Sequence, residues 1–406
     1  MVDVQRFDVA VIGAGIAGSA LATALSGNGL DIALVEAQSL TPAALPAERS
    51  LGSFDPRVSA ITPRSKALLE NWGAWEAIAA YRQCPYHHMT VWDAEGTGGI
   101  EFDRDDVNAP ALGHIVENRA IVNALLEQLA GCADVTTYSG RPLLDCRRTE
   151  ADPPMVVQLE SGITLAADLV VAADGANSRV RDMMSFATRE WDYGHCAIVT
   201  TVQVEHSHQD TCWQRFLISG PLAFLPLCGE GGRHYCSIVW SVQEPLVDDL
   251  MRLDDAAFCA ALESAYEGRL GKIVGCSGRF AFPLRQRHAT DYVQAGVALV
   301  ADAAHTIHPL AGQGINLGLQ DVAVLAQELL TGHGKGLKLG DLELLRRYQR
   351  RRKGENLMMM AAMDGFKALF EQQALPLRWL RNAGMRSVSK MGPVKQQLIR
   401  RAMGVG

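Results

Sequence analysis

The feature that most constrains the fold is the segment 7–36, which predicts a strand, a glycine-rich turn, a helix and a second strand. The apolar run 7–12 is typical of a buried parallel strand, and so is the run 31–36. Two parallel strands joined by a helix belong to an α/β sheet that is covered by helices on both faces. The chain therefore contains at least one such βαβ unit.

The turn inside this unit has the spacing of a dinucleotide-binding motif. Gly13 permits a tight turn, Gly15 lets the backbone approach a pyrophosphate, and Gly18 lets the helix pack close to the strand. Glu36 ends the second strand 21 residues after Gly15, where its carboxylate can accept a hydrogen bond from a ribose. These four residues predict that the chain binds a dinucleotide.

A second ligand-binding turn is predicted at 299–316. An apolar run ends at Asp302, and a segment rich in glycine leads into a helix-like run at 317–330. Glycines at the start of a helix let backbone N–H groups approach a planar or anionic ligand. A carboxylate at a strand end suits a ribose or ribityl hydroxyl. The polar and small residues of this turn are Asp302, Pro309, Gly312, Gly314 and Asn316.

The order of the predicted elements indicates an α/β fold with an interrupted nucleotide domain. A third buried strand ends at Asp174, and residues 195–240 alternate as in an antiparallel sheet. We expect a discontinuous Rossmann-like domain, an inserted, mostly antiparallel substrate domain, and a C-terminal helical region. The expected boundaries are 1–80, 105–185 and 285–335 for the first, 81–104 and 186–284 for the second, and 336–406 for the third.

Composition excludes several classes of protein. No apolar window is long enough to span a membrane, and no signal peptide is expected. Nine cysteines occur without a Cys-x-x-Cys pair, which argues against a disulfide framework or a zinc site and suits a reducing cytoplasm. His305 and His308 have no third ligand at a suitable spacing, so no metal is expected. The net charge of −7 argues against nucleic acid as a partner.

The charge is unevenly distributed along the chain. Residues 375–406 contain seven Lys and Arg and no acidic residue, so the rest of the chain carries −14. Leu, Met, Val and Trp side chains are interleaved with these cations. Such a tail could bind an anionic membrane surface, because each cation near it contributes about 1 kcal/mol. A solvated helical face or a contact between subunits remains an equal alternative.

Three motifs occur in a characteristic order: the glycine turn at 13–18, Ala-Asp-Gly at 173–175, and Asp-Ala-Ala-His at 302–305 followed by Gly-Gln-Gly-Ile-Asn at 312–316. In this order they resemble the flavoprotein aromatic hydroxylases of the para-hydroxybenzoate hydroxylase type. Residues 308–318 and 55–61 resemble one subgroup more closely, the FAD-dependent hydroxylases of ubiquinone biosynthesis. Within it, the segments 84–93, 236–241 and 392–404 are most similar to the VisC/UbiI type, the 2-octaprenylphenol hydroxylases.

This resemblance, which covers essentially the whole chain, implies an FAD-dependent monooxygenase. NAD(P)H would reduce the flavin, O2 would form a flavin C4a-hydroperoxide, and one oxygen would pass to the ring of a polyprenylated phenol. The enzyme would be cytoplasmic and peripheral to the inner membrane, in contact with other ubiquinone-biosynthesis enzymes or as a homo-oligomer. Alternatives are a hydroxylase of a small soluble aromatic compound, or a non-catalytic, FAD-stabilised subunit of a biosynthetic complex.

The resemblance also assigns roles to individual residues. Gly13, Gly15 and Gly18 would hold the pyrophosphate, Glu36 the adenosine ribose and Asp302 the ribityl chain. Arg57 and Arg119 would reach the phosphates or the flavin edge, with ion pairing as the alternative. Asp174 would contact the cofactor or cap a helix. Gly312, Gly314 and Asn316 would face the flavin ring, with Pro309 and Gly312 at the reaction centre. Substrate walls would come from Phe224, Leu225, Phe282 and Pro283, which are otherwise ordinary core residues.

One position departs from the family pattern. The family usually has Gly-Asp where this chain has Ala301-Asp302. The extra methyl group would crowd the pyrophosphate unless the backbone adjusts.

Overall fold

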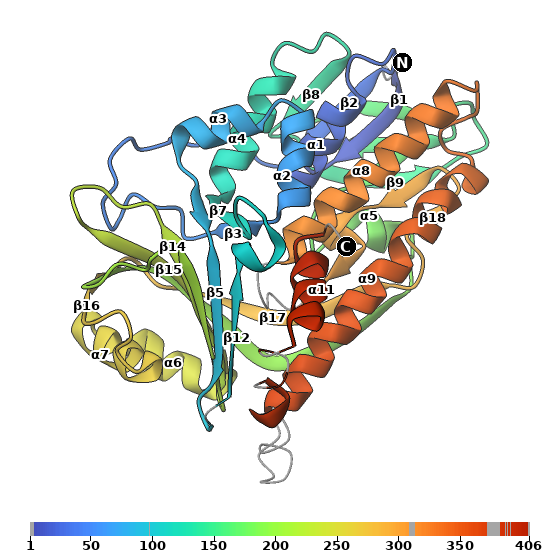
Figure 1. Cartoon of the computed structure of the whole chain (residues 1–406). Coiled ribbons are helices and arrows are strands. Elements are labelled where there is room, and N and C mark those ends of the chain that lie inside the picture. Colours follow the sequence, from blue (N-terminus) through green and yellow to red (C-terminus); the bar gives the residue numbers. More distant parts are fainter. Residues whose placement is uncertain are drawn as a thin grey trace.

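The computed structural model describes residues 4–96, 98–307, 313–371, 382–385, 387, 389 and 391–404. It is built around two large β-sheets, with a small third sheet beside them (Figure 1). The helices lie mostly outside these sheets, and α9 runs diagonally across the molecule.

The first sheet contains the predicted βαβ unit. Its central strands pair in parallel, with β1 between β2 and β11 and with β19 next to β11. Their apolar side chains are buried on both faces, as a parallel sheet between helices requires. The eight strands are β1 (Val4–Ile12), β2 (Ile32–Glu36), β8 (Val135–Ser139), β9 (Leu143–Arg148), β10 (Met155–Leu159), β11 (Thr164–Ala172), β18 (Val293–Gln294) and β19 (Val297–Leu299).

The second sheet has nine strands and is antiparallel except where β5 pairs with β13. One of its faces packs against α6 and α7, where Trp92, Phe224 and Ile238 meet Phe258 and Tyr266. The strands are β5 (His88–Asp93), β6 (Gly99–Asp103), β12 (Thr188–Val204), β13 (Thr211–Leu217), β14 (Gly220–Leu227), β15 (His234–Gln243), β16 (Ile273–Cys276), β17 (Phe280–Ala289) and β20 (His305–Thr306).

A three-stranded sheet lies between the two large ones. In it, β7 (Gly113–Glu117) pairs with both β3 (Val58–Ile61) and β4 (Cys84–Tyr86). Side chains of this sheet share an apolar cluster with Leu227 and Tyr235 of the nine-stranded sheet region. The small sheet therefore connects the two halves of the molecule.

The helices are α1 (Ile16–Leu25), α2 (Pro63–Asn71), α3 (Trp75–Tyr81), α4 (Asn118–Leu129), α5 (Arg179–Met183), α6 (Glu244–Arg252), α7 (Asp255–Tyr266), α8 (Gln313–His333), α9 (Leu342–Glu371) and α11 (Gly392–Ala402), with 3-10 turns η1 (Arg104–Val107) and η2 (Ala301–Ala303). Helix α8 packs against α1 and α9, and α11 packs against η1. None of the helices in the described part of the chain is long and apolar enough to cross a membrane.

The composition of the sheets differs from the expected segments in two places. Strand β20 and the last residues of β17 fall inside the expected nucleotide segment 285–335 but belong to the nine-stranded sheet. The nine-stranded sheet takes its strands from 88–103, 188–289 and 305–306. Strand β4, at 84–86, falls inside the expected substrate segment but pairs with β7 instead. The domain boundaries at 80/81 and 284/285 remain predictions.

Candidate functional site

The parallel strands of the first sheet end along one edge, and the predicted ligand turns meet there. Ile12 of β1 is level with Val35 of β2 and Ala172 of β11, and Ala172 is level with Leu299 of β19. The residues that follow these strands are therefore neighbours. In α/β sheets this carboxyl edge is where ligands bind.

The three glycines of the first turn differ in what surrounds the position that a side chain would occupy. Gly13 has φ +100°, and a Cβ there would lie 2.5 Å from the Ala173 carbonyl oxygen. A Cβ on Gly18 would lie 1.7 Å from the Gly13 oxygen, so helix and turn are in direct contact. Gly15 at the start of α1 is different, because no atom lies within 4 Å of its Cβ position. Open space in front of a helix N-terminus is what a pyrophosphate needs.

Glu36 is fixed beside this turn. Its Oε2 accepts a hydrogen bond of 2.8 Å from the Ala14 backbone N–H, and its Oε1 one of 3.0 Å from the Gln38 N–H. The carboxylate is therefore held at the end of β2, next to the glycine turn, as the predicted ribose contact requires.

Asp174 caps a helix in this structure. Its Oδ2 accepts hydrogen bonds from the Arg179 and Val180 backbone N–H groups at 2.8 and 3.2 Å, at the start of α5. Burial raises the pKa of this carboxyl, and these hydrogen bonds oppose the rise. The geometry is that of the capping alternative. Contact with a cofactor remains a prediction.

The turns after β11 and β19 are joined by a buried arginine. Arg181 donates from Nη1 to the Ala303 carbonyl oxygen at 3.2 Å and from Nη2 to that of Ala176 at 3.0 Å. Since its side chain is almost fully buried, it fixes the spacing of the two turns.

Ala301 adopts a backbone conformation that favours glycine. Its φ is +52°, in the left-handed region where a Cβ costs about 1–2 kcal/mol. Its methyl group lies against Gly318 of α8, where an added Cβ would come within 2.7 Å of it. The methyl group is therefore accommodated against α8. Having alanine where the family usually has glycine strains the backbone at this position.

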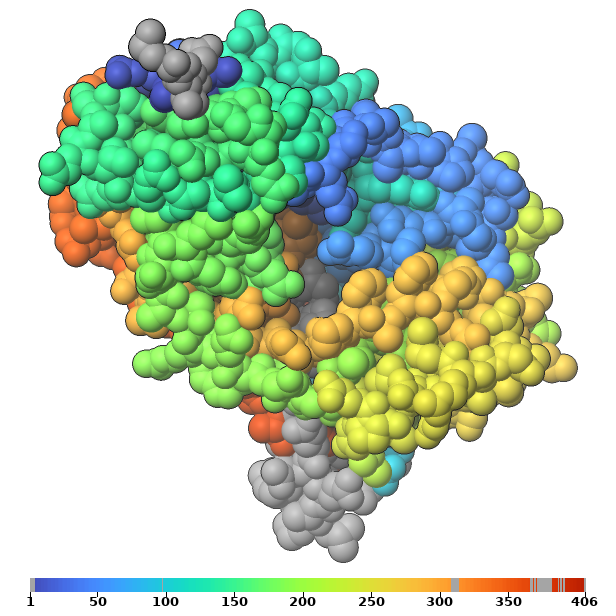
Figure 2. All heavy atoms as spheres, turned by 180° about the vertical axis from the view of Figure 1, so that it is seen from behind, coloured from blue at the N-terminus to red at the C-terminus, as the bar shows by residue number. Residues whose placement is uncertain are grey.

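Asp302, the next residue, has an exposed side chain, yet enough protein surrounds the carboxyl that its partial desolvation raises its pKa. His305 and Arg57 act in the opposite direction, so the Arg57 guanidinium is close by. Arg57 makes no ion pair with the described residues. Figure 2 shows a hollow on the rear face, bordered by blue, green and orange segments that lie far apart in the sequence.

A buried cluster of charged and polar side chains packs against the turn at 301–303. The Asp321 carboxylate accepts hydrogen bonds from the Ala301 N–H at 3.2 Å, the Arg352 Nε at 2.8 Å and the Asn356 Nδ2 at 3.1 Å, and lies 2.5 Å from the His305 Nε2. Burial alone would raise the pKa of Asp321, but His305 and Arg352 lower it below its usual value. Asp321 is therefore ionised and links η2, β20, α8 and α9.

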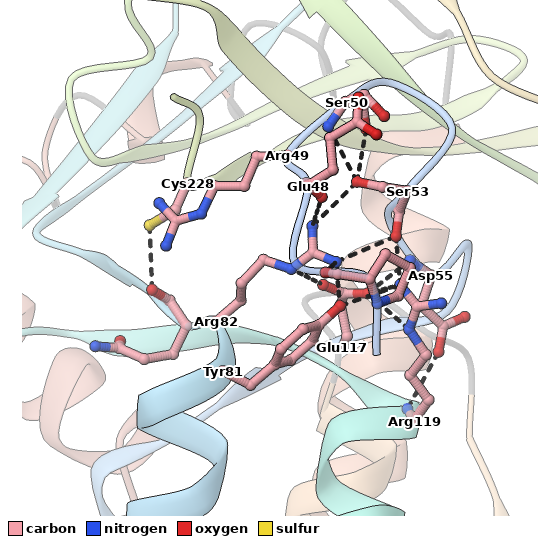
Figure 3. A network of polar contacts seen from close by, with 12 residues as sticks. Glu48, Arg49, Ser50, Ser53, Asp55, Tyr81, Arg82, Glu117, Arg119 and Cys228 are labelled. Atoms are coloured by element: carbon pink, nitrogen blue, oxygen red, sulfur yellow. Dashed lines mark hydrogen bonds and ion pairs between the residues drawn. The ribbon is translucent and has the colours of Figure 1, made fainter. Parts of the chain in front are cut away.

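Arg119 lies in a second network, shown in Figure 3. Its Nη2 is 2.6 Å from the Glu117 Oε2, and the other oxygen of Glu117 is 3.1 Å from the Arg82 Nε. Glu117 also accepts a hydrogen bond of 2.8 Å from the Asp55 N–H, and Asp55 accepts one of 3.1 Å from the Arg119 N–H. Ion pairing thus accounts for Arg119. Arg57 joins this network through its backbone, whose N–H donates to the Asp55 Oδ1 at 2.9 Å, and its guanidinium forms no ion pair with the described residues.

The flavin-side residues are only partly described. The buried Asn316 side chain accepts from the Thr62 N–H at 3.0 Å and donates to the Ala60 oxygen at 2.8 Å, so it joins α8 to β3. Gly314 lies in the first turn of α8. Pro309 and Gly312 lie outside the described residues, and their roles remain predictions.

The predicted substrate walls lie on opposite faces of the second sheet. Phe224 is fully buried and stacks on Tyr266 of α7, with ring centroids 3.8 Å apart, so the core alternative describes it. Leu225 points to the other face, toward the small sheet. Phe282 is 40% exposed and Pro283 is also exposed, on β17.

Sequence reasoning missed the residues that position the site. Asp321 is the single acid inside the run 317–326, which is otherwise almost entirely apolar, and this is a signal of a buried partner. Arg352 gave no such signal, because it lies within the cationic run 346–353 and resembles a solvated residue. Within the described part of the chain, no group of His, Cys, Asp and Glu is arranged to hold a metal ion.

These features fit FAD. The open space at Gly15, the fixed Glu36 carboxylate and the exposed Asp302 lie along one strand edge. The Arg57 guanidinium, which forms no ion pair with the described residues, is close to Asp302. The fold and the site together define an FAD-dependent monooxygenase.

Comparison with known proteins gives the family. A family model described as "FAD binding domain" matches residues 6–361. The 3-demethoxyubiquinol 3-hydroxylase of Escherichia coli K12 is 36% identical over 401 residues, covering 99% of each chain. The ubiquinone hydroxylase UbiL of Rhodospirillum rubrum is 35% identical, covering 98% of this chain and 89% of the relative. Human ubiquinone biosynthesis monooxygenase COQ6 is 34% identical, covering 97% and 92%.

Solved structures share the fold. PqsL of Pseudomonas aeruginosa has a TM-score of 0.77 at 22% identity, covering 94% of this chain and 100% of PqsL. The p-nitrophenol 4-monooxygenase PnpA of Pseudomonas putida has a TM-score of 0.75 at 16% identity, covering 98% of each chain. The chain belongs to the FAD-binding-domain family, with the FAD-dependent hydroxylases of ubiquinone biosynthesis among its relatives.

Proposed function

We propose that this enzyme hydroxylates the aromatic ring of a polyprenylated phenol in ubiquinone biosynthesis, using NAD(P)H and O2. The observation that supports this most is similarity along almost the whole chain to a hydroxylase of a ubiquinone precursor. The names of the relatives give different substrates. Experiment must therefore identify the ring carbon that this enzyme hydroxylates, and show whether its substrate is the one used by the 2-octaprenylphenol hydroxylases.

Bound FAD would supply the chemistry that activates O2 for oxygen transfer. The protein would hold the cofactor through the Gly15 turn, Glu36, Arg57 and Asp302. An apolar sheet face would receive the substrate, because Phe280, Phe282 and Leu284 of β17 lie on the same face as Ala197 and Val199 of β12. Apolar walls also exclude water from such a reaction.

The test is turnover by the purified, FAD-loaded protein. With a polyprenylated phenol we expect substrate-dependent oxidation of NADH or NADPH and a product heavier by one oxygen atom. Equal turnover of a short, unprenylated phenol would favour the small-substrate alternative. No NAD(P)H oxidation with any phenol at full FAD loading would favour the non-catalytic subunit. Complementation of strains that each lack one ring hydroxylase would then identify the ring carbon.

We also propose that the enzyme works in the cytoplasm at the surface of the inner membrane, where a polyprenylated substrate is concentrated. Helix α11 supports this. Ile399 and Met403 anchor it in an apolar cluster with Leu112, and the Lys395 Nζ lies 2.6 Å from the Asp106 Oδ2. Docked in this way, the helix leaves Met391, Val394 and Leu398 exposed, by 51%, 38% and 42%. Their spacing places them along one stripe.

The membrane proposal is tested with vesicles. Arg400 and Arg401 are exposed near the stripe, so anionic vesicles should bind better than neutral ones. Leu398→Glu should weaken co-sedimentation with anionic vesicles, whereas Gln396→Glu, with the same charge change at another exposed position of α11, should weaken it less. Equal effects of the two variants, or no binding by the wild type, would contradict the proposal. In that case the stripe is a solvated face or a contact with another subunit or enzyme.

A further inference from the structure

The small sheet and the nine-stranded sheet meet at two thiols. Cys84 begins β4 and is buried, whereas Cys228 directly follows β14 and is half-buried. Cys84 is a core member of an apolar cluster, and Cys228 packs against this cluster. In its protonated form the Cys228 thiol donates to the carbonyl oxygen of Gln83, the residue before Cys84, at 3.1 Å. This contact fixes the Cys228 sulfur next to the start of β4.

An arginine lies against the more exposed thiol. The Arg49 guanidinium is beside the Cys228 sulfur (Figure 3) and donates to the Gly229 carbonyl oxygen at 3.4 Å. The neighbouring Cys84 lowers the pKa of the Cys228 thiol, and Arg49 acts in the same direction, although burial and Asp210 oppose it. Burial and the neighbouring Cys228 both raise the pKa of the Cys84 thiol. The Arg49 guanidinium and the greater exposure of Cys228 therefore favour Cys228 as the reactive thiol of the two.

We propose that Cys84 and Cys228 form an oxidisable dithiol, with Cys228 as the residue that reacts with hydrogen peroxide and Cys84 as the residue that resolves it. The Cys228 thiolate attacks one peroxide oxygen, the O–O bond breaks, and hydroxide leaves to give a sulfenic acid. The Cys84 sulfur then attacks the Cys228 sulfur and the S–O bond breaks. The two thiols lose two electrons, and the peroxide becomes two waters.

A second thiol pair in the same chain lacks the features that favour reaction. Cys259 of α7 and Cys276 of β16 are also close enough for each to influence the pKa of the other. Burial raises the pKa of Cys276 to about 12 and also raises that of Cys259. Neither thiol is therefore favoured as a thiolate, which is the reactive form. This pair is an internal control, since proximity alone would oxidise both pairs equally.

The disulfide would link β4 to the end of β14 covalently. It would therefore join the small sheet to the nine-stranded sheet, close to Arg82 and its ion pair with Glu117. Peroxide is added as a reagent in the test below, so the inference does not depend on the proposed substrate.

The experiment uses the full-length, FAD-loaded protein, reduced and then exposed to equimolar hydrogen peroxide. Free thiols are blocked with N-ethylmaleimide, and peptides are mapped by mass without reduction. We expect a cross-linked peptide pair that contains Cys84 and Cys228, lighter by two hydrogen atoms, before any Cys259–Cys276 pair forms. Equal or earlier oxidation of Cys259–Cys276, over-oxidation of Cys228 while Cys84 remains free, or no reaction would each overturn the proposal.

Variants separate the two roles. Cys84→Ser should leave a sulfenic acid at Cys228 that dimedone labels, whereas Cys228→Ser should leave Cys84 unlabelled. Arg49→Gln should slow the reaction severalfold, while Arg233→Gln, an exposed arginine on the same hairpin, should not. Dimedone labelling of Cys84 in Cys228→Ser, or equal rates for the two arginine variants, would contradict the assigned roles.

Discussion

Gly15 and Gly18 are three residues apart but have opposite surroundings, and this separates ligand binding from folding. A side chain at Gly15 meets no atom within 4 Å, whereas one at Gly18 meets the Gly13 oxygen at 1.7 Å. We therefore predict that Gly15→Val leaves the unfolding free energy of the apoprotein within about 0.5 kcal/mol of wild type. The same variant should lose FAD affinity, because its side chain fills the pyrophosphate space.

Gly18→Val is the matched control. It should destabilise the apoprotein by several kcal/mol, because helix α1 must move away from the turn. Thermal unfolding with and without added FAD measures both effects, since a ligand that binds only the folded state raises its stability. A normal FAD-dependent shift in Gly15→Val would contradict the assignment of the site.

Ala301→Gly should stabilise the protein. The native φ of +52° strains alanine but not glycine, so the free energy of unfolding should rise by up to about 1 kcal/mol after the greater flexibility of unfolded glycine is counted. Denaturant unfolding measures it. Ala303→Gly is the control in the same turn: it removes a buried methyl group and should destabilise by about 1 kcal/mol. A loss of stability in both variants would show that the alanine is not strained.

Among single residues, the sequence predicts those whose role depends only on the neighbouring backbone. The glycines and Glu36 follow from one short spacing motif. The residues that hold the site in place come from distant segments: Asp321 meets Arg352 31 residues later, and Arg181 reaches Ala303 across 122. No local pattern contains such pairs, because each depends on how helices and turns pack.

At the scale of elements, helices α8 and α9 are joined by a buried ion pair between Asp321 and Arg352. His305 and Arg352 hold the pKa of Asp321 below its usual value despite burial. A carboxyl with a lowered pKa in the folded state stabilises the protein above its unfolded-state pKa of about 3.9. This stabilisation is lost as the pH falls through the lower folded-state value.

We therefore predict that Asp321→Asn destabilises the protein by about 3–5 kcal/mol near neutral pH, because Arg352 loses its buried partner. The difference from wild type should narrow as the pH falls below about 4. Urea unfolding across this pH range measures it. Glu343→Gln, which removes an exposed pair with Arg346, should change stability by less than about 1 kcal/mol. A difference from wild type that does not depend on pH would contradict the ionised state of Asp321.

Element types were easier to predict than their ends. The segment 63–81 has a helical pattern throughout, yet the structure divides it into α2 and α3 around Gly73, which has φ +75°. A left-handed glycine ends a helix. Residues 279–284 predict a short strand, whereas β17 continues to Ala289 because β12 and β20 supply partners for its second half.

For the whole molecule, the predicted fold class and the interrupted nucleotide domain agree with the structure and with its fold relatives. The small sheet was not predicted, because β4 is too short to reveal its partner. The parallel pairing of β5 with β13 joins segments more than 100 residues apart and has no local signature. Such pairings are decided by long-range packing.

Helix α9 sets a fixed distance between the two halves of the molecule. Near its middle Arg352 holds the Asp321 cluster, and further along Asp364 accepts a hydrogen bond of 2.6 Å from the Tyr193 hydroxyl of β12. The two residues are twelve positions apart, which corresponds to about 18 Å of helix. One inserted residue would rotate Asp364 by about 100° away from Tyr193. Helix α9 thus fixes the distance between the turn at Asp302 and the nine-stranded sheet. An insertion or deletion in α9 keeps both contacts on the correct side of the helix only if it adds or removes about a whole helical turn.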